Sequence, residues 1–97
     1  MARVAVDVCV GRVGIDLLHA AGHVVIVEAQ HGEPDRDWFA RAREHDVEVV
    51  IAADKDLAIL CYDHRVEWFR AQPGDSGRVI AERFIRRYAA RALRRIS

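Results

Sequence analysis

The sequence contains little of several residue types that mark common protein classes. Its two cysteines, Cys9 and Cys61, lie far apart and form no CxxC pair, so we predict neither a disulfide framework nor a cysteine-based zinc site. No apolar run approaches the ~20 residues of a membrane span, and we expect no signal peptide before the first predicted strand. Together these absences predict a reduced, cytoplasmic protein.

Several motifs that carry chemistry are also missing. The chain has no GxGxxG, no Walker loop and no GxSxG, which argues against dinucleotide binding, P-loop chemistry and a serine hydrolase. Internal repeats, low-complexity segments and linkers are absent as well. The whole chain, 1–97, is therefore predicted to form a single domain.

The charge of the chain is balanced overall but unevenly distributed. Residues 1–77 carry 8 basic and 14 acidic side chains, whereas residues 78–97 carry seven arginines and one glutamate. The net charges of the two parts are therefore −6 and +6. An acidic body with a basic C-terminal segment suits a partner of mixed charge, or a nucleic acid held beside bound metal.

Short apolar runs alternate with amphipathic segments along the chain. With short connections, this alternation predicts crossovers between parallel strands. The predicted fold class is α/β, a three-layer α/β/α sandwich with a short, mainly parallel sheet. Strands are predicted at about 3–8, 23–29, 47–53 and 66–71, and helices at about 11–21, 35–44, 56–62 and 78–96.

The predicted helices carry recognisable end signals and apolar faces. Gly22 suits the position after the first helix, and Asp35 suits an N-cap of the second. The side chains expected to be buried are Val13, Leu17, Leu18 and Ala21 on the first helix, Trp38, Phe39 and Ala42 on the second, and Ala81, Phe84, Ile85, Tyr88, Ala89, Ala92 and Ile96 on the last.

Acidic residues follow two of the predicted strands directly. Asp7 ends the first apolar run, and the run Val49–Ala53 stops at Asp54 and Asp56. Ligands of open α/β sheets bind beyond the carboxyl ends of the strands. Carboxylates gathered there repel one another, and a bound divalent cation explains such a cluster best.

The order of these residues resembles the compact PIN-like proteins, relatives of the PIN ribonucleases of VapC-type toxins. The resemblance covers about residues 3–70, and its most specific part is the spacing of Asp7, an acidic helix start and an Asp-x-Asp pair. Its segments are Asp7 itself, Ala21-Gly22-His23, Asp35-Arg36-Asp37-Trp38 and Ala53-Asp54-Lys55-Asp56-Leu57.

The resemblance implies a metal-dependent nuclease that cleaves RNA with a cluster of three or four carboxylates and Mg²⁺ or Mn²⁺. By position, Asp7 and Asp54 resemble the strand-end metal ligands of the family, and Asp56 resembles its further catalytic acid. Asp35 and Asp37 are both candidates for the acid at the middle helix. A protein antitoxin and a homodimer are further expectations from the resemblance.

The sequence differs from the pattern of the family in two segments. Cys9 lies where relatives often carry an asparagine, and Ala52 and Ala53 replace a hydroxyl residue before the acidic pair. These differences support an alternative hypothesis, a catalytically weak or inactive PIN-like module that binds or regulates a partner.

Basic residues provide candidate nucleic-acid contacts. Lys55 lies between two acids, where it would either contact a scissile phosphate or offset local charge. The last predicted helix gathers arginines opposite its apolar face, and these would contact phosphates, remain solvated or meet a second subunit. The arginines on this face are Arg83, Arg86, Arg87, Arg91 and Arg94.

Overall fold

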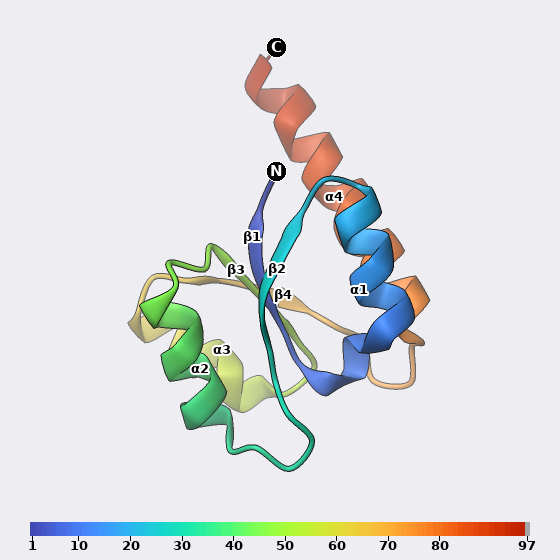
Figure 1. The fold of residues 1–97 in the computed structure, drawn as a ribbon. Coiled ribbons are helices and arrows are strands. Elements are labelled where there is room, and N and C mark those ends of the chain that lie inside the picture. The colour runs from blue at the N-terminus through green and yellow to red at the C-terminus, as the bar shows by residue number, and fades with distance from the viewer. Residues whose placement is uncertain (97) are drawn as a thin grey trace.

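The structure, a computed structural model, describes residues 1–96, with side chains as far as Arg91. Four strands form one wholly parallel sheet in the order β2-β1-β3-β4 (Figure 1). The predicted α/β class and parallel sheet are therefore confirmed. The elements are β1 (Arg3–Val6), the 3₁₀ turn η1 (Val8–Val10), α1 (Gly11–Ala20), β2 (Val24–Glu28), α2 (Asp35–Glu44), β3 (Val49–Ala52), α3 (Lys55–Asp63), β4 (Glu67–Arg70) and α4 (Gly77–Ile96).

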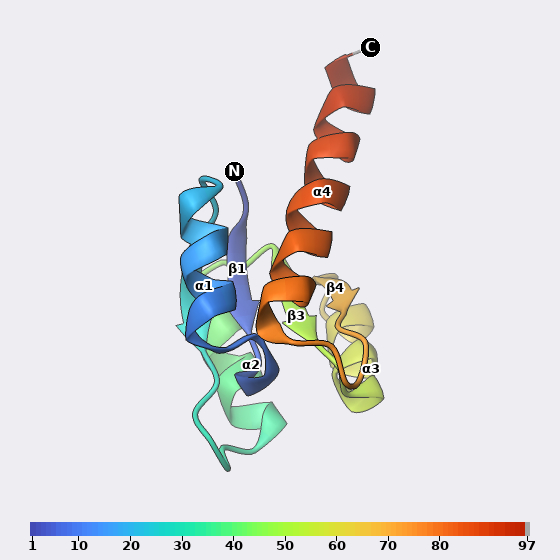
Figure 2. The same ribbon diagram turned by 90° about the vertical axis from the view of Figure 1, so that its right-hand side faces the viewer.

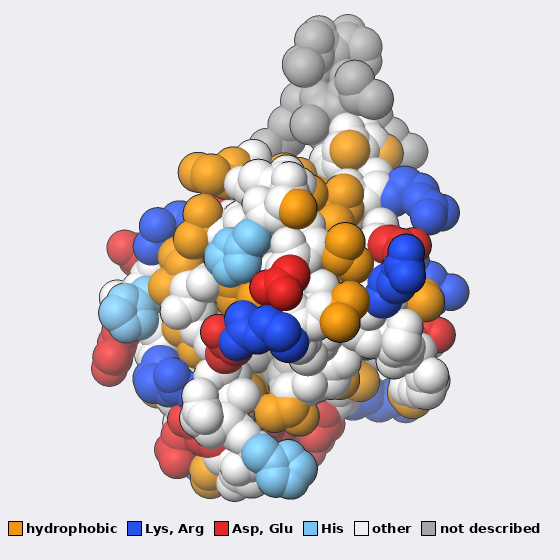
Figure 3. Space-filling model, turned by 45° about the vertical axis from the view of Figure 1, so that its right-hand side comes forward, with side chains coloured by type: hydrophobic (Ala, Val, Ile, Leu, Met, Phe, Trp, Pro, Cys, Tyr) orange, Lys and Arg blue, Asp and Glu red, His pale blue; other side chains and the backbone are white. Residues whose placement is uncertain are grey.

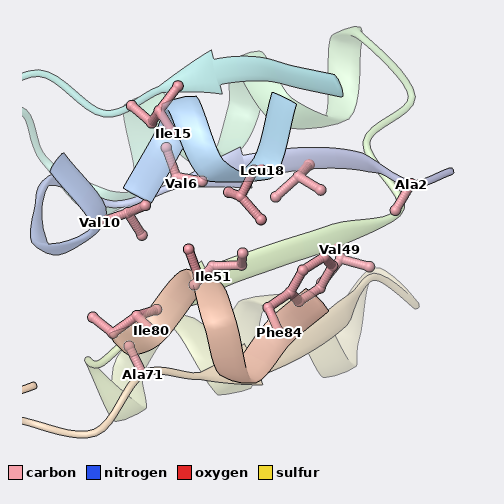
Figure 4. Packing of buried hydrophobic residues seen from close by; sticks show 12 residues of the cluster. Ala2, Val6, Val10, Ile15, Leu18, Val49, Ile51, Ala71, Ile80 and Phe84 are labelled. Atoms are coloured by element: carbon pink, nitrogen blue, oxygen red, sulfur yellow. The ribbon is translucent and has the colours of Figure 1, made fainter. Parts of the chain in front are cut away.

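Helices cover both faces of the sheet, with α1 and α4 on one face and α2 and α3 on the other (Figure 1). All four residues of the central strand β3 are buried, as expected for a strand covered on both faces. On the α1/α4 face, Leu18, Ile51 and Phe84 pack toward one another (Figure 4). On the α2/α3 face, Trp38 and Leu57 are fully buried.

Three helices end in the same way, with a residue of positive φ after the last turn. These residues are Gly22 after α1, Asp46 after α2 and Arg65 after α3, with φ of 91°, 54° and 58°. In each case this residue and the next donate their N–H groups to carbonyls of the last helical turn, which is the Schellman arrangement. The prediction for Gly22 is confirmed, while Asp46 and Arg65 adopt a conformation that costs non-glycine residues about 1 kcal/mol.

Helix α4 lies against the 3₁₀ turn at its first residue. A Cβ built on Gly77 would lie 1.8 Å from the carbonyl oxygen of Val10, and one on Gly14 would lie 2.7 Å from the carbonyl oxygen of Gly77. Further along, the hydroxyl of Tyr88 donates to the carbonyl of Met1 over 3.2 Å. The helix thus runs from the carboxyl edge of the sheet, where the strands end, to the amino edge, where they begin, and extends beyond it (Figure 2).

Some details of the sequence analysis are wrong. Val8 belongs to the 3₁₀ turn and not to the first strand, because its N–H is bonded by the side chain of Asp7. Val13 is 60% exposed and Ala21 is also exposed, whereas Gly14 and Ile15 are buried, because the close approach of Gly14 to Gly77 sets the rotation of α1.

The face predicted for α4 is confirmed at Ala81 and Phe84, which are buried, but Ala89 is exposed. The predictions for the side chains of Ala92, Arg94 and Ile96 lie outside the described residues. Within the described part of the chain, no helix is both long and apolar enough to cross a membrane.

Candidate functional site

The two strands that precede the predicted acids are neighbours in the centre of the sheet. From β1 the chain turns into α1 on one face, and from β3 it turns into α3 on the other. Connections that diverge in this way open a crevice at the carboxyl edge. The backbone N–H of Asp7 donates to the carbonyl of Ile51 over 3.0 Å, so the start of the first turn is tied directly to β3 at this crevice.

Asp7 and Asp54 occupy equivalent positions, each at the N-cap of the element that follows its strand. An oxygen of Asp7 accepts the N–H of Val8 at 2.7 Å, and an oxygen of Asp54 accepts the N–H of Asp56 at 2.9 Å. These bonds satisfy backbone donors that the helical turns leave unpaired. Each carboxylate is thereby oriented by one oxygen, and its second oxygen remains available for another partner.

The start of α2 brings a third carboxylate to the same crevice. The prediction that Asp35 is the N-cap of α2 is wrong. Pro34 takes that position, and Asp35 is the first helical residue. Its carboxylate instead accepts the indole N–H of Trp38 over 3.1 Å. The preceding loop is held by Glu33, which accepts the N–H of Gln30 at 2.9 Å and pairs with Arg41 at 2.6 Å.

Asp35 shares its surroundings with the other two carboxylates. Burial raises the pKa of Asp35 above its ordinary value, the Trp38 indole counteracts this, and the negative charges of Asp54 and Asp7 raise it further. A hydrogen bond to the Asp54 carboxylate also favours the protonated form of Asp35 and so raises its pKa. We call Asp7, Asp35 and Asp54 the carboxylate cluster.

Asp37 and Asp56, the other predicted acids, lie beside this cluster and not in it. They line an open hollow of about 470 Å³ between α2 and α3, together with Asp35, Arg36 and Ile59. We call this the acidic hollow. Asp37 is exposed, whereas Asp35 is within reach of the charges of Asp54 and Asp7, so Asp35 is the acid of this helix start that faces the cluster.

The sequence analysis missed two charged residues on the opposite side of the cluster. Arg12 and Glu28 line a second hollow, of about 200 Å³, with Asp7. The guanidinium of Arg12 lies 3.5 Å from Glu28 and 3.9 Å from Asp16. The sequence pattern that identified Asp7 and Asp54 is also present at Glu28, which is the last residue of β2 and follows an apolar run.

The predicted nucleic-acid contacts lie in two different places. Lys55 begins α3 beside the cluster and is exposed. The α4 arginines contact the body of the protein: Arg83 lies 3.0 Å from Asp75, Arg87 lies 5.8 Å from the centre of the Phe69 ring, and Arg91 pairs with Glu67.

Glu67 begins β4, so Arg91 lies at the amino edge, opposite the carboxylate cluster. The face seen in Figure 3 carries basic and acidic side chains next to one another. Arg91 and the carboxylate cluster therefore lie at opposite edges of the sheet.

Cys9 borders the cluster from the 3₁₀ turn. Its thiol is partly buried, and burial followed by the negative charge of Asp7 raises its pKa above the ordinary value. A thiol that remains protonated at neutral pH is a poor nucleophile. Cys61 is also free but fully buried, and burial raises its pKa to about 11.

The donor set of the cluster fits a hard divalent cation by its chemistry. Carboxylate oxygens are the ligands that Mg²⁺ and Mn²⁺ prefer, and the repulsion that Asp35 experiences from Asp54 and Asp7 is the condition that a cation relieves. Among the described residues, no three His, Cys, Asp or Glu side chains are arranged so that they could hold one ion together. Ligation by this cluster therefore requires side-chain rotation.

No family model, curated protein or solved structure matches the chain. The assignment of a function therefore rests on the residues and geometry described above.

Proposed function

We propose that this chain is a PIN-like, divalent-metal-dependent nuclease that acts on RNA. The observation that carries the proposal is the convergence of Asp7, Asp35 and Asp54 at the crevice between β1 and β3. Burial and the negative charges of Asp54 and Asp7 raise the pKa of Asp35, and a ligand that uses these charges would relieve the repulsion. The cost of this repulsion is the reason for assigning the cluster a function.

In this proposal, the second oxygens of Asp7, Asp35 and Asp54 hold Mg²⁺ or Mn²⁺. The bound ion supplies charge neutralisation at the phosphate and an activated water. The backbone N–H groups of Val8 and Asp56 each bond one oxygen of Asp7 and Asp54, and the side-chain rotation that ligation requires would have to keep or replace these bonds. Lys55, exposed at the start of α3, contacts the phosphate backbone of the RNA and adds salt dependence to binding.

Asp56 lines the acidic hollow next to Asp35, where it is the further acid of the site. In the same proposal, the hollows on either side of the cluster accommodate the RNA on both sides of the cleaved bond.

A second candidate function retains the PIN-like fold without turnover, as a regulatory module or one half of a toxin–antitoxin pair. The residues beside the cluster favour this candidate. Cys9 and Ala53 offer no strong hydrogen-bond donor or hydroxyl to a water or phosphate. The two candidates differ in catalysis and share the binding of a cation or phosphate.

The deciding experiment is calorimetric titration with Mn²⁺ of the wild-type chain, Asp54→Asn and Asp63→Asn. Asparagine still accepts the N–H of Asp56, so Asp54→Asn preserves the cap of α3. Asp63 is an exposed acid at the far end of the same helix and serves as the matched control. We expect binding in the wild type and the control and at least about tenfold weaker binding in Asp54→Asn.

Cleavage of single-stranded RNA then separates the two candidates. The nuclease hypothesis requires Mn²⁺-dependent cleavage that falls at least about 100-fold in Asp7→Asn and in Asp54→Asn. Cleavage that persists in chelator or in both variants would contradict it. Mn²⁺ binding without any cleavage supports the regulatory module.

A further inference from the structure

The edge strand β4 presents backbone groups that nothing in the described chain pairs. Its only neighbour there is β3, and the N–H groups of Glu67 and Ala71 donate to Glu48 and Ala52 over 3.1 and 3.0 Å. Because successive residues of a strand point their N–H groups to opposite sides, Trp68 and Arg70 direct theirs outward. Such a row of unpaired groups is a template for one more strand.

An apolar groove runs beside this edge on the α3 face. It measures about 490 Å³. Ile59 and Tyr62 border it and are 63% and 85% exposed, although side chains of their size are usually buried. The lining residues are Ala58, Ile59, Cys61, Tyr62, Val66 and Trp68.

On the α4 face, the same edge is aromatic and basic. Phe69 points to this face, where Arg87 lies over its ring and Arg91 pairs with Glu67. Arg65 precedes the strand and Arg70 ends it, and both are exposed, but by the alternation of side chains Arg70 lies on the opposite face, that of Trp68. Arginines therefore outnumber acids around β4.

The two faces specify the chemistry of an added strand. Its side chains would alternate between the apolar groove and the arginine face. Apolar residues suit the first and acidic residues suit the second. A second copy of this chain would bring the same arginines against one another across a two-fold axis, and like charges placed opposite each other are unfavourable.

We propose that β4 and the apolar groove bind an extended segment of a partner protein in which apolar and acidic residues alternate, as one additional strand of the sheet. Strand addition obtains affinity from main-chain hydrogen bonds and specificity from alternate side chains. The proposal is independent of the carboxylate cluster, since neither Asp7 nor Asp54 lines the groove.

The test uses a fluorescent eight-residue probe, Ser-Val-Glu-Val-Asp-Val-Glu-Ser, and the full chain, followed by fluorescence anisotropy. We expect saturable binding, and roughly tenfold weaker binding of a probe with lysine at each acidic position. N-methylation of one alternate set of peptide nitrogens should abolish binding and that of the other set should not, because only one set faces β4. Equal effects of the two N-methylated probes, or no binding of the acidic probe, would overturn the proposal.

Variants locate the site on the protein. Ile59→Asp, in the groove, should weaken binding of the acidic probe roughly tenfold, and Arg87→Glu should reverse the preference in favour of the lysine probe. Val13→Asp changes an equally exposed side chain on α1 and should leave binding unchanged. Thermal unfolding checks that all three variants fold.

Two results would assign the edge to other occupants and overturn the proposal. The first is a concentration-dependent dimer in sedimentation that Ile59→Asp dissociates. The second is displacement of the probe by an oligouridylate at equal concentration, with the same loss in Ile59→Asp.

Discussion

At the carboxyl edge of the sheet the charges of Asp7 and Asp54 act on a third carboxylate, Asp35, whereas at the amino edge charged groups meet opposite charges or backbone carbonyls. Asp35 and Asp54 approach closely enough to affect protonation. By contrast, Arg91 pairs with Glu67, and Arg3 donates to the carbonyls of His45 and Asp46 at 2.6 and 3.2 Å. The amino edge uses charge to fix the chain, while at the carboxyl edge the carboxylates of Asp7, Asp35 and Asp54 have no ion-pair partner among the described residues and are available to a ligand.

Helix α4 is held differently at these two edges. At the carboxyl edge the contact is steric, between Gly77 and the backbone of Val10. At the amino edge the contacts are polar and aromatic, with Tyr88 bonded to Met1 and packed on His23. Steric contacts between backbones cannot relax as side chains do, so the carboxyl edge determines where α4 begins.

The largest effect on stability is expected from Gly77→Ala. Helix propensity alone favours alanine by about 1 kcal/mol, yet the new Cβ would lie 1.8 Å from the Val10 oxygen. We therefore expect a loss of about 3 kcal/mol or more in the free energy of unfolding, as in overpacked sites. Urea unfolding measures it, with Ala89→Gly on the exposed side of the same helix as a control that should cost only about 1 kcal/mol. Equal free energies of unfolding for Gly77→Ala and the wild type would show that the backbone of Val10 moves to accommodate the new Cβ.

A smaller effect, at the amino edge, depends on pH. His23 is 6% exposed and its Nδ1 accepts the N–H of Ala2 at 3.1 Å. Burial and then the N-terminal charge lower the pKa of His23 below its usual 6.5. The unfolded state therefore binds a proton at a pH where the native state does not. The contribution of neutral His23 to the free energy of unfolding is fully present above pH 6.5 and should decrease as the pH falls below this value.

Urea midpoints at pH 7.5 and 5.5 measure this dependence. His23→Gln should lose much of it and also about 1 kcal/mol of stability at pH 7.5, because the hydrogen bond from Ala2 is disturbed. His45→Gln, at an exposed histidine, is the control and should keep the wild-type dependence. An unchanged pH dependence in His23→Gln would show that another titratable group causes the loss of stability at low pH.

The smallest effect is expected from Asp35→Asn at the carboxyl edge. The pKa of Asp35 is raised above its usual 3.8, so the native state prefers the protonated form. That preference stabilises the fold at low pH and is lost as the pH rises through the raised value. At pH 7 the ionised carboxyl is a penalty, and Asp35→Asn should be more stable than the wild type by about 0.5 kcal/mol.

The same comparison at pH 3.5 should show a reduced difference. Asp37→Asn is the matched control, because Asp37 also lies in the first turn of α2 but only loses a favourable interaction with the helix dipole. It should therefore be slightly destabilising. A destabilised Asp35→Asn at pH 7 would contradict the repulsion inferred for the cluster.

Local sequence signals predicted much of the fold and part of the candidate site. The apolar runs ending at Asp7 and Asp54 identified the two central strands, because a strand covered on both faces needs apolar residues throughout. Gly22 marked the end of α1 for a local reason, its positive φ. Asp46 and Arg65 carry no such signal, because a positive φ is uncommon for residues other than glycine.

Long-range geometry was not predictable in the same way. The choice between Asp35 and Asp37 depends on the Trp38 indole, which holds the Asp35 carboxylate, and on how α2 meets β3. The position of the α4 arginines depends on the direction of the whole helix, which the Gly77 contact sets. The helical periodicity grouped Arg83, Arg87 and Arg91 but could not say which part of the sheet each of them reaches.

Ile59 forms part of the wall of both the acidic hollow and the apolar groove. A ligand that selects one rotamer of this exposed side chain in one hollow changes the shape of the other. Occupancy of the two hollows is then coupled by a single free energy, which must have the same value in both directions. In that case a peptide on β4 would tune the affinity of the acidic hollow, and the ligand of the acidic hollow would tune the affinity for the peptide by the same factor.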